Sequence, residues 1–350
     1  NENASRGFLS LSNDPAQILF DLDKGTLAPY RFDGVDMIDK PLKLTVFRDP
    51  TPNDYVDKNG YVSWKDNASL VREVVDAKYH SIDEYTVAVD FMSRYSNSSG
   101  ATMMDVKQTI LVLHSGDVLM ENEIVVSDYL RQMPRLGFQT IVGNSLDTVS
   151  WYGLNIESYP DRRNGAITTV NSLQLENASY NYSPNQSSGN HADVRWVSFT
   201  NDKVGFFVDM VDDCFNFSVS PAEERIAFFD FGHAGIGSSV AGVPISHGTM
   251  LRKRNYKFTL HLCAYDVLEY EPHDFRRIEF PKTESSVLPV PVIGCDKDRF
   301  NQPMKVNLSC AIPNADIRYT LDGSIPTEKS LLYSKPFTIE STTIVTARAF

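Results

Sequence analysis

The chain has 350 residues, of which 42% are hydrophobic and 22% charged, a composition typical of a folded protein with a sizeable core. Its net charge of −12 and its pI near 5.1 argue against nucleic acid as a partner, because phosphates would be repelled. The sequence has no apolar run long enough to cross a bilayer, so we expect no membrane span. Its four cysteines and seven histidines lack metal-ligand spacing, so we expect no metal site and no cofactor.

Short segments of alternating apolar and polar residues predict antiparallel strands along most of the chain. Residues 85–91 alternate in this way, and residues 110–114 are joined to residues 118–120 by the turn Ser115-Gly116-Asp117. Further strands are predicted at residues 206–210, 226–231 and 256–262. Residues 127–133 and 221–225 have a weak helical pattern. Many evenly spaced strands with few helices predict an all-β fold built as a sandwich of antiparallel sheets.

A boundary between two domains is predicted where the apolar pattern stops. We expect a first domain over residues 1–270, a linker over residues 271–287 and a smaller β-domain over residues 288–350. In the second domain Asp322-Gly323 predicts a tight turn. Because the chain ends at Phe350 within a predicted strand, we expect this domain to be truncated or to continue in a longer parent protein.

Two clusters between Pro134 and Trp196 place aromatic rings beside Arg/Asp pairs. This combination suits a carbohydrate surface, because sugar C–H faces pack on rings while hydroxyls bind charged groups. It also suits a sandwich core with buried ion pairs, and residue chemistry alone favours this structural interpretation. The first cluster comprises Pro134, Arg135, Leu136, Gly137, Phe138, Trp151, Tyr152, Gly153, Tyr159, Pro160, Asp161 and Arg162; the second comprises Tyr182, Ser183, Pro184, Asn185, Gln186, Gly189, Asn190, His191, Ala192, Asp193, Val194, Arg195 and Trp196.

The order and spacing of these clusters resemble the C-terminal sandwich, or small-chain, domain of family 2 glycoside hydrolases of the β-galactosidase type. Segments 20–34, 48–54 and 233–237 resemble further motifs of that domain, so the resemblance covers about residues 8–265. It implies a large antiparallel super-sandwich of the galactose-mutarotase type. Residues 317–327, with the run Tyr-Thr-Leu-Asp-Gly-Ser, resemble the small Ig-like or fibronectin-like domain at the C-terminus of chitobiases and hexosaminidases.

The resemblance implies that this chain carries no catalytic residues. Glycoside hydrolysis needs two carboxylates, and in the resembled family both lie on a (β/α)₈ barrel that precedes the sandwich. The sequence lacks the strand–helix alternation of such a barrel. A mutarotase-like acid, His191 or His233, is conceivable from the fold, but no glutamate stands in a partner motif. The remaining glutamates are expected to be surface charges or turn residues: Glu121, Glu123, Glu157, Glu176, Glu223 and Glu224.

The candidate site residues fall into two groups. Those expected to line a carbohydrate cleft are His191, His233, Trp151, Tyr159 and Gln186. Those expected to be structural or to contact another domain are Arg48, Asp54, Asp161, Arg162, Asp193, Arg195 and Trp196. The two histidines stand in predicted loops at a sheet end, where binding residues concentrate. Asp161 and Arg162 could pair with each other, and Asp193, Arg195 and Trp196 are expected on one strand with alternating faces.

We therefore expect the chain to be the non-catalytic C-terminal portion of an exported family 2 glycoside hydrolase, periplasmic or extracellular. Its expected partners are the catalytic barrel of the parent protein and a β-galactoside-type carbohydrate, with homo-oligomerisation left open. The alternative is a free-standing carbohydrate-binding or adhesion protein with a lectin-like surface, and a purely structural linker module is third. A disulfide between Cys295 and Cys310 is also left open.

Overall fold

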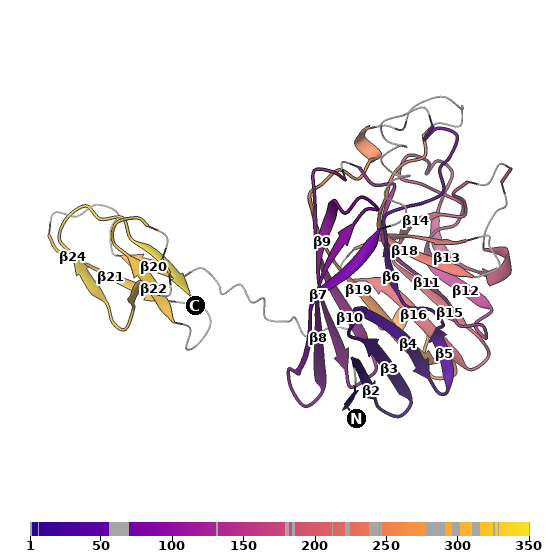
Figure 1. The fold of residues 1–350 in the computed structure, drawn as a ribbon, viewed down its shortest axis with the longest axis horizontal. Helices are drawn as coiled ribbons and strands as arrows, with labels where there is room; N and C mark the ends of the chain where they lie inside the picture. The colour runs from indigo at the N-terminus through magenta and orange to yellow at the C-terminus, as the bar shows by residue number, and fades with distance from the viewer. Residues whose placement is uncertain are drawn as a thin grey trace. The chain divides into compact units, whose positions relative to one another are not determined.

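The computed structural model divides the chain into two compact units, Asn1–Ile278 and Glu279–Phe350 (Figure 1). It describes residues 2–5, 7–55, 70–130, 132–178, 182–183, 186–211, 213–220, 225–237, 245, 247–276, 291–295, 302–309, 316–324, 326–327 and 329–349. The cut between the units falls within the segment 271–287 that the sequence suggested as a linker.

The first unit contains three sheets in its described part, and every strand pairing in them is antiparallel. One five-stranded sheet is made of β1 (Glu2–Ser5), β2 (Phe8–Ser12), β3 (Ala16–Asp21), β4 (Thr26–Phe32) and β5 (Val35–Ile38) in chain order. A nine-stranded sheet has the order β13 (Thr168–Gln174), β12 (Thr148–Leu154), β15 (Trp196–Thr200), β16 (Val204–Met210), β19 (Asn255–Asp266), β10 (Val118–Val126), β9 (Thr102–Leu113), β8 (Thr86–Ser96) and β7 (Val71–Ser81). The third sheet has the order β14 (His191–Val194), β17 (Phe215–Val219), β18 (Ile226–His233), β11 (Arg135–Ile141) and β6 (Lys43–Thr45). The expected all-β antiparallel fold class is confirmed.

Aromatic rings on the inner face of the nine-stranded sheet join it to both other sheets. Phe199 of β15 packs edge-to-face on Phe217 and Phe229 of the third sheet, with ring centres 5.9 and 6.2 Å apart. Tyr30 of β4 meets Phe206 of β16 at 6.1 Å. Because successive side chains of a strand point to opposite faces, alternation along these strands places one row of large apolar residues in a shared core.

The outer face of the same sheet carries a smaller buried cluster. Trp196 lies opposite Asp209 on the neighbouring strand, and Asp209 lies opposite His261, so these side chains share the outer face. A short helix, α2 (Pro272–Phe275), covers them through Phe275, whose ring centre is 5.4 Å from that of Phe207. Residues 271–276, expected to begin the linker, therefore pack on the sandwich because their aromatic ring completes this cluster.

Helices are short in the described part of the chain: α2, η1 (Leu175–Asn177) and η2 (His247–Thr249). Within residues 127–133, where a weak helical pattern was noted, the described residues form turns. Ser127 donates a side-chain hydrogen bond to the carbonyl oxygen of Thr102 at 2.7 Å, and Met133 bridges to Leu251. Residues 221–224 lie outside the described residues. None of the helices described here has the length and apolar character needed to span a membrane.

The second unit contains two three-stranded sheets in its described part. One has the order β20 (Val292–Cys295), β21 (Met304–Ser309) and β24 (Phe337–Ile339); the other has the order β23 (Leu331–Leu332), β22 (Ile317–Thr320) and β25 (Thr346–Ala349). Its core contains Val306, Leu308, Ile317 and Ile339. The predicted turn is present, with Gly323 at a φ of 80° and the Asp322 carboxylate accepting the amide of Ser324 at 3.0 Å.

Candidate functional site

A hollow of about 250 Å³, the motif hollow, lies in the first unit where four segments distant in sequence meet. It is bounded by the segment after β6, the segment after β12, the segment before β14 and the segment after β18. The lining residues are Thr51, Pro52, Asn53, Glu157, Tyr159, Arg162, Tyr182, Gln186, Ser187 and Ile236. Most of them stand in or beside the motif segments that the sequence singled out.

A buried ion pair holds the first of these segments. Arg48 Nη1 and Nη2 donate to the Asp54 carboxylate at 2.7 and 3.1 Å, and both side chains have no exposed surface. The same carboxylate accepts the backbone amide of Thr51 at 2.6 Å. Asn53 Nδ2 donates to the carbonyl oxygen of Ile236 at 2.9 Å, and Arg48 Nη2 donates to that of Gly235 at 3.4 Å. The pair therefore shapes its own loop and attaches that loop to the end of β18.

Asp161 and Arg162 hold the same stretch of backbone from the other side. The Asp161 carboxylate accepts the amides of Ile236 at 3.1 Å and Gly237 at 2.8 Å, while Arg162 Nε donates to the carbonyl oxygen of Gly237 at 2.8 Å. A Cβ at Gly235 would lie 2.2 Å from Asp161 Oδ2, which explains the glycine at that position. The sequence had suggested that these two side chains could pair with each other. Instead, both bind the backbone of residues 236–237.

Asp161→Asn is expected to lower the free energy of unfolding by about 1–3 kcal/mol, because one of two buried amides loses its acceptor. Hydrogen exchange of the Ile236 and Gly237 amides should accelerate in the same variant, and chemical denaturation measures the free energy. Asp193→Asn is the matched control, since the Asp193–Arg163 pair is exposed and should contribute less than about 1 kcal/mol. Unchanged exchange in Asp161→Asn would show that other contacts hold this loop.

Glu157 connects three parts of the wall of the motif hollow. Its Oε1 accepts the Tyr159 hydroxyl and the Gly189 amide, each at 2.9 Å, and its Oε2 accepts the Tyr182 hydroxyl at 2.6 Å. Burial, followed by the charge of Glu157, raises the pKa of Tyr159, so this phenol remains a donor. The sequence interpretation treated Glu157 as a surface charge. The only signal of its role was its place two residues before Tyr159 in the motif.

Among the described residues that line the motif hollow, Glu157 is the sole carboxylate. Hydrolysis of a glycosidic bond requires a pair of carboxyl groups that flank the bond. The oxygens of Glu157 already accept three hydrogen bonds from the protein. The Glu157 carboxylate is therefore held in place as part of the wall of the motif hollow.

Two of the five expected cleft-lining residues, Tyr159 and Gln186, line the motif hollow. Trp151, His191 and His233 are not among its lining residues, and 2%, 6% and 3% of their surface is exposed. Tyr159 is equally buried, with 2% of its surface exposed. His191 stacks on Trp151 with ring centres 4.3 Å apart, and His233 lies 5.4 Å from the ring of Tyr159. Sequence spacing placed both histidines at a sheet end, but their rings are part of the aromatic packing behind it.

Burial keeps both histidines neutral. It lowers the pKa of His191 and, together with the charges of Arg135 and Arg48, lowers the pKa of His233 well below its ordinary value. His191 Nδ1 lies 3.1 Å from the carbonyl oxygen of Leu154, and His233 Nδ1 lies 2.7 Å from that of Ala234. These contacts orient the rings as parts of the framework.

Asp193, Arg195 and Trp196 do not lie on one continuous strand. Asp193 lies within β14 at a φ of 55°, where the register of that strand is irregular, and Arg195 separates β14 from β15. Asp193 pairs with Arg163 at 2.6 Å, and the guanidinium of Arg195 lies 5.0 Å from the ring centre of Tyr152. Trp196 joins the outer-face cluster. Strand alternation would have placed these three side chains on two faces of one strand. The left-handed backbone at Asp193 and the interruption at Arg195 give each of them different surroundings.

The sequence interpretation missed a buried ion pair between the neighbouring strands β11 and β18. Arg135 pairs with Asp230 at 2.8 Å and stacks on Phe228, with its guanidinium 4.0 Å from the ring centre. Burial outweighs the attraction of Arg135 and raises the pKa of Asp230 to about 6. The two residues are 95 positions apart, so no local pattern connects them.

In the described part of the chain, one group of side chains has the composition of a metal site: Asp117, His261 and Cys263, all buried, with ligand atoms within 4.8 Å of one another. His261 Nε2 is 2.7 Å from Asp117 and its Nδ1 is 2.9 Å from Asp209. Burial, with the neighbouring charge of Asp117, raises the pKa of the Cys263 thiol well above its ordinary value. His261 is thus held by ion pairs to both aspartates.

Cys214 and Cys263 are free thiols. The disulfide between Cys295 and Cys310 that the sequence left open involves Cys310, which lies outside the described residues.

Comparison with known proteins connects both units to sugar-processing families. Residues 12–262 match the family model described as beta galactosidase small chain, and residues 296–350 match the chitobiase/beta-hexosaminidase C-terminal domain. A beta-galactosidase of Pseudoalteromonas haloplanktis is 24% identical over 287 residues, covering 75% of this chain and 27% of that protein. One of Arthrobacter sp. (strain B7) is 37% identical over 70 residues, which are 20% of this chain and 7% of that protein. The chain spans about a quarter of the length of the first of these relatives.

Solved structures similar to the chain include sugar epimerases. A galactose 1-epimerase from Lactobacillus acidophilus NCFM has a TM-score of 0.43 at 10% identity, covering 76% of this chain and 98% of that one. A GalM/aldose epimerase homologue from C. elegans has a TM-score of 0.38 at 10% identity, covering 75% of this chain and 100% of that one. The two family resemblances drawn from the sequence motifs are confirmed by the matching family models.

Proposed function

The chain belongs to the β-galactosidase small chain family through residues 12–262, and from this premise we propose that it completes the substrate cleft of a separate catalytic chain or domain. In this proposal the motif hollow forms part of the cleft wall and contacts a β-galactoside-type carbohydrate. The glycosidic bond of that carbohydrate is hydrolysed by two carboxylates of the catalytic partner. The proposed role is to position substrate and to stabilise the partner.

The observation that carries the proposal is the convergence of four loops on one polar hollow. Residues 48–54 and 161–162 both bind the backbone of 235–237, and Glu157 attaches the segment after β12 to the segment before β14 through Tyr182. Fixed loops of this kind present side chains without a large loss of conformational entropy on binding. The exposed edge of Tyr182, at 40% of its surface, adds an aromatic group beside the polar lining.

Complementation of a catalytic chain tests the proposal. This chain alone should not hydrolyse a chromogenic galactoside, whereas adding it to a catalytic barrel of the same family should raise the rate by about 10²-fold, the effect typical of lost positioning groups. Asp161→Asn should complement less well and Asp193→Asn as well as the natural chain. Hydrolysis by the isolated chain would overturn the proposal, and so would a catalytic barrel whose rate the chain leaves unchanged.

A further inference from the structure

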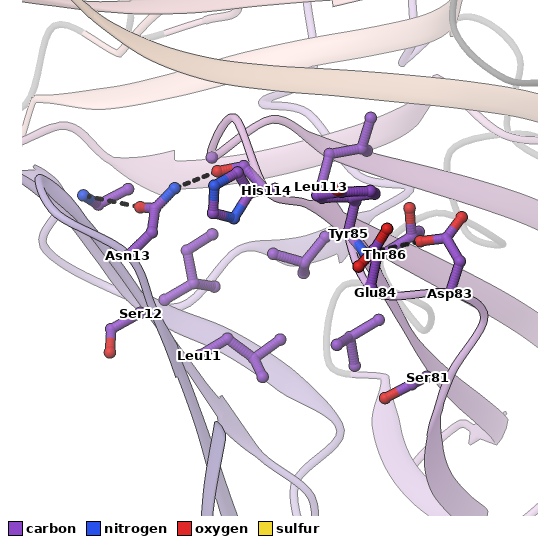
Figure 2. A pocket seen from close by; sticks show the side chains of 15 residues that line it. Leu11, Ser12, Asn13, Ser81, Asp83, Glu84, Tyr85, Thr86, Leu113 and His114 are labelled. Atoms are coloured by element: carbon purple, nitrogen blue, oxygen red, sulfur yellow. Dashed lines mark hydrogen bonds between the residues drawn. The ribbon is translucent and has the colours of Figure 1, made fainter. Parts of the chain in front are cut away.

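A second cavity, the hairpin hollow, has a volume of about 280 Å³ and lies where three hairpin turns meet (Figure 2). These are the turns between β2 and β3, between β7 and β8, and between β9 and β10. Its lining residues are Leu11, Ser12, Asn13, Ala16, Ile18, Ser81, Asp83, Glu84, Tyr85, Thr86, Val87, Val112, Leu113, His114 and Gly116. None of the motif residues singled out in the sequence contributes to it.

The hairpin hollow and the motif hollow lie at opposite ends of strand β19. The chain enters β19 beside the motif hollow, because Leu251 bridges to Met133 and the carbonyl oxygen of Thr249 accepts the amide of Gly235 at 3.0 Å. Farther along, Leu262 of β19 pairs with Val118 at the start of β10, directly after the turn that contributes Gly116. The stretch from Asn255 to Leu262 extends over about 26 Å at ~3.3 Å per residue, so the two cavities are separate.

Hydrogen bonds hold all three walls of the hairpin hollow. The side-chain amide of Asn13 donates to the carbonyl oxygen of His114, which connects the first turn to the third. The hydroxyl of Tyr30 donates to the carbonyl oxygen of Gly116 at 2.8 Å. In the second turn the Asp83 carboxylate accepts the amide of Tyr85 at 2.8 Å. The cavity is therefore preformed, which lowers the entropic cost of binding a ligand.

The lining of the hairpin hollow combines an aromatic ring, an apolar floor and a polar rim. Tyr85 has 58% of its surface exposed, and its ring centre lies 6.0 Å from that of His114. Figure 2 shows Tyr85 beside Leu113 and His114, with Asp83 and Glu84 next to it on the same turn. The lining also includes the hydroxyls of Ser12, Ser81 and Thr86 and the carboxylates of Asp83 and Glu84. Both hydrogen-bond donors and acceptors are thus available beside the apolar side chains of the lining.

We propose that the hairpin hollow binds one ring of a neutral carbohydrate. A sugar presents a C–H face, which packs on Tyr85 and the floor, and hydroxyls that both donate and accept hydrogen bonds along the rim. The described lining residues include no lysine or arginine, and Asp83 and Glu84 repel anions, so phosphorylated ligands are disfavoured. The volume is near the lower end for small-molecule sites, which fits a single ring rather than a long chain.

This carbohydrate site would act without the catalytic partner, because none of its residues contributes to the motif hollow. Its role would be to hold the protein bound to a glycan while the bond to be cleaved is bound at another site. Weak individual binding is sufficient for such a role, since a second contact on one polymer acts at high effective concentration.

NMR titration of the full chain with lactose, cellobiose and N-acetylglucosamine tests the proposal. At least one sugar should give saturable shifts confined to the three hairpin turns. Tyr85→Ala should weaken that binding by about tenfold, whereas Tyr85→Phe should retain it because the ring is kept. Tyr129→Ala is the matched control, since Tyr129 is an exposed tyrosine of a turn that does not line the cavity. Circular dichroism of each variant confirms that the fold is intact.

Three results would overturn the proposal. One is the absence of saturable shifts in the hairpin turns with every sugar. The second is binding that Tyr85→Ala leaves unchanged. The third is binding of an amine such as putrescine in place of sugars, with an affinity that falls steeply with salt, which would identify a cation site built on Asp83 and Glu84. None of these results depends on complementation of the catalytic chain, so the proposed function would stand or fall separately.

Discussion

His261→Ala is expected to lower the free energy of unfolding by about 3–5 kcal/mol, the typical loss when a buried ion pair keeps only one partner. His261 has no exposed surface and connects Asp117, at 2.7 Å, to Asp209, at 2.9 Å. Removing the imidazole leaves two buried carboxylates with one cation among the described residues paired to them, the guanidinium of Arg276, which is 2.7 Å from Asp209. The reason for the large effect is therefore unpaired charge as well as lost volume.

The stabilisation that His261 contributes to the folded state should decrease as the pH rises. Burial by itself lowers the pKa of His261, but the hydrogen bonds and charges of Asp117 and Asp209 outweigh it and hold the pKa above 6.5. A group whose pKa is higher in the folded state contributes its full stabilisation at pH values below its unfolded-state pKa. That stabilisation is lost as the pH rises through the folded-state pKa. The free-energy difference between the natural chain and His261→Ala should accordingly shrink on the alkaline side.

The stabilisation from Asp117 has the opposite pH dependence and should decrease as the pH falls. Burial raises the pKa of Asp117, but the hydrogen bond and charge of His261 outweigh it and hold the pKa below 3.8. The stabilisation from Asp117 is present above that value and is lost as pH falls through the folded-state pKa. The network should therefore contribute most between about pH 3.8 and 6.5.

Urea denaturation at several pH values measures both effects. His80→Ala is the matched control, because His80 is 58% exposed at its side chain and lies 3.7 Å from Asp90. His80→Ala should change the free energy of unfolding by no more than about 1 kcal/mol. A His261→Ala variant as stable as His80→Ala, or one whose deficit grows with rising pH, would contradict the proposed charge of this network.

Arg48→Met is expected to cost a similar ~3–5 kcal/mol and, in addition, to deform the motif hollow. Methionine has a comparable length but no charge, so Asp54 would keep only the amide and hydroxyl of Thr51 as close partners. The contact of Arg48 with the carbonyl oxygen of Gly235 would also be lost. Residues 51–53 should then separate from the end of β18, because one side of their attachment is gone.

Stability and complementation together measure the effect of Arg48→Met. Thermal or urea denaturation gives the free energy, and activity of the mixture with a catalytic chain reports the state of the hollow. Arg94→Met is the control, since Arg94 pairs with Asp105 at 2.9 Å on the surface and should contribute less than about 1 kcal/mol. Equal stability of the two variants would show that the buried pair is not what holds the loop.

Much of the β-architecture could be predicted from local patterns. Residues 110–120 form the expected hairpin of β9 and β10, and residues 206–210, 226–231 and 256–262 lie in β16, β18 and β19. These predictions hold because strand alternation and turn chemistry act over a few residues. Tyr159 and Gln186, expected to line a cleft, line the motif hollow, and so does Arg162, which was expected to be structural or to contact another domain.

Partners distant in sequence could not be predicted in this way. His261 gave no signal as a histidine in an alternating strand, and its partners Asp209 and Asp117 are 52 and 144 positions away. Glu157 looked like a surface carboxylate until Tyr182, 25 positions away, was found beside it. The hairpin hollow depends on three turns from separate hairpins, none of which carries a motif.

Taken alone, the amino-acid order determined that this protein is all-β, that it has a large and a small part, and that it belongs with the β-galactosidase small chains. It could do so because alternation, turns and motif spacing are properties of neighbouring residues. Only the tertiary structure decided which charges are buried, which rings are covered and where cavities remain. Those outcomes follow from sheet register and packing, which bring together residues that the chain itself keeps far apart.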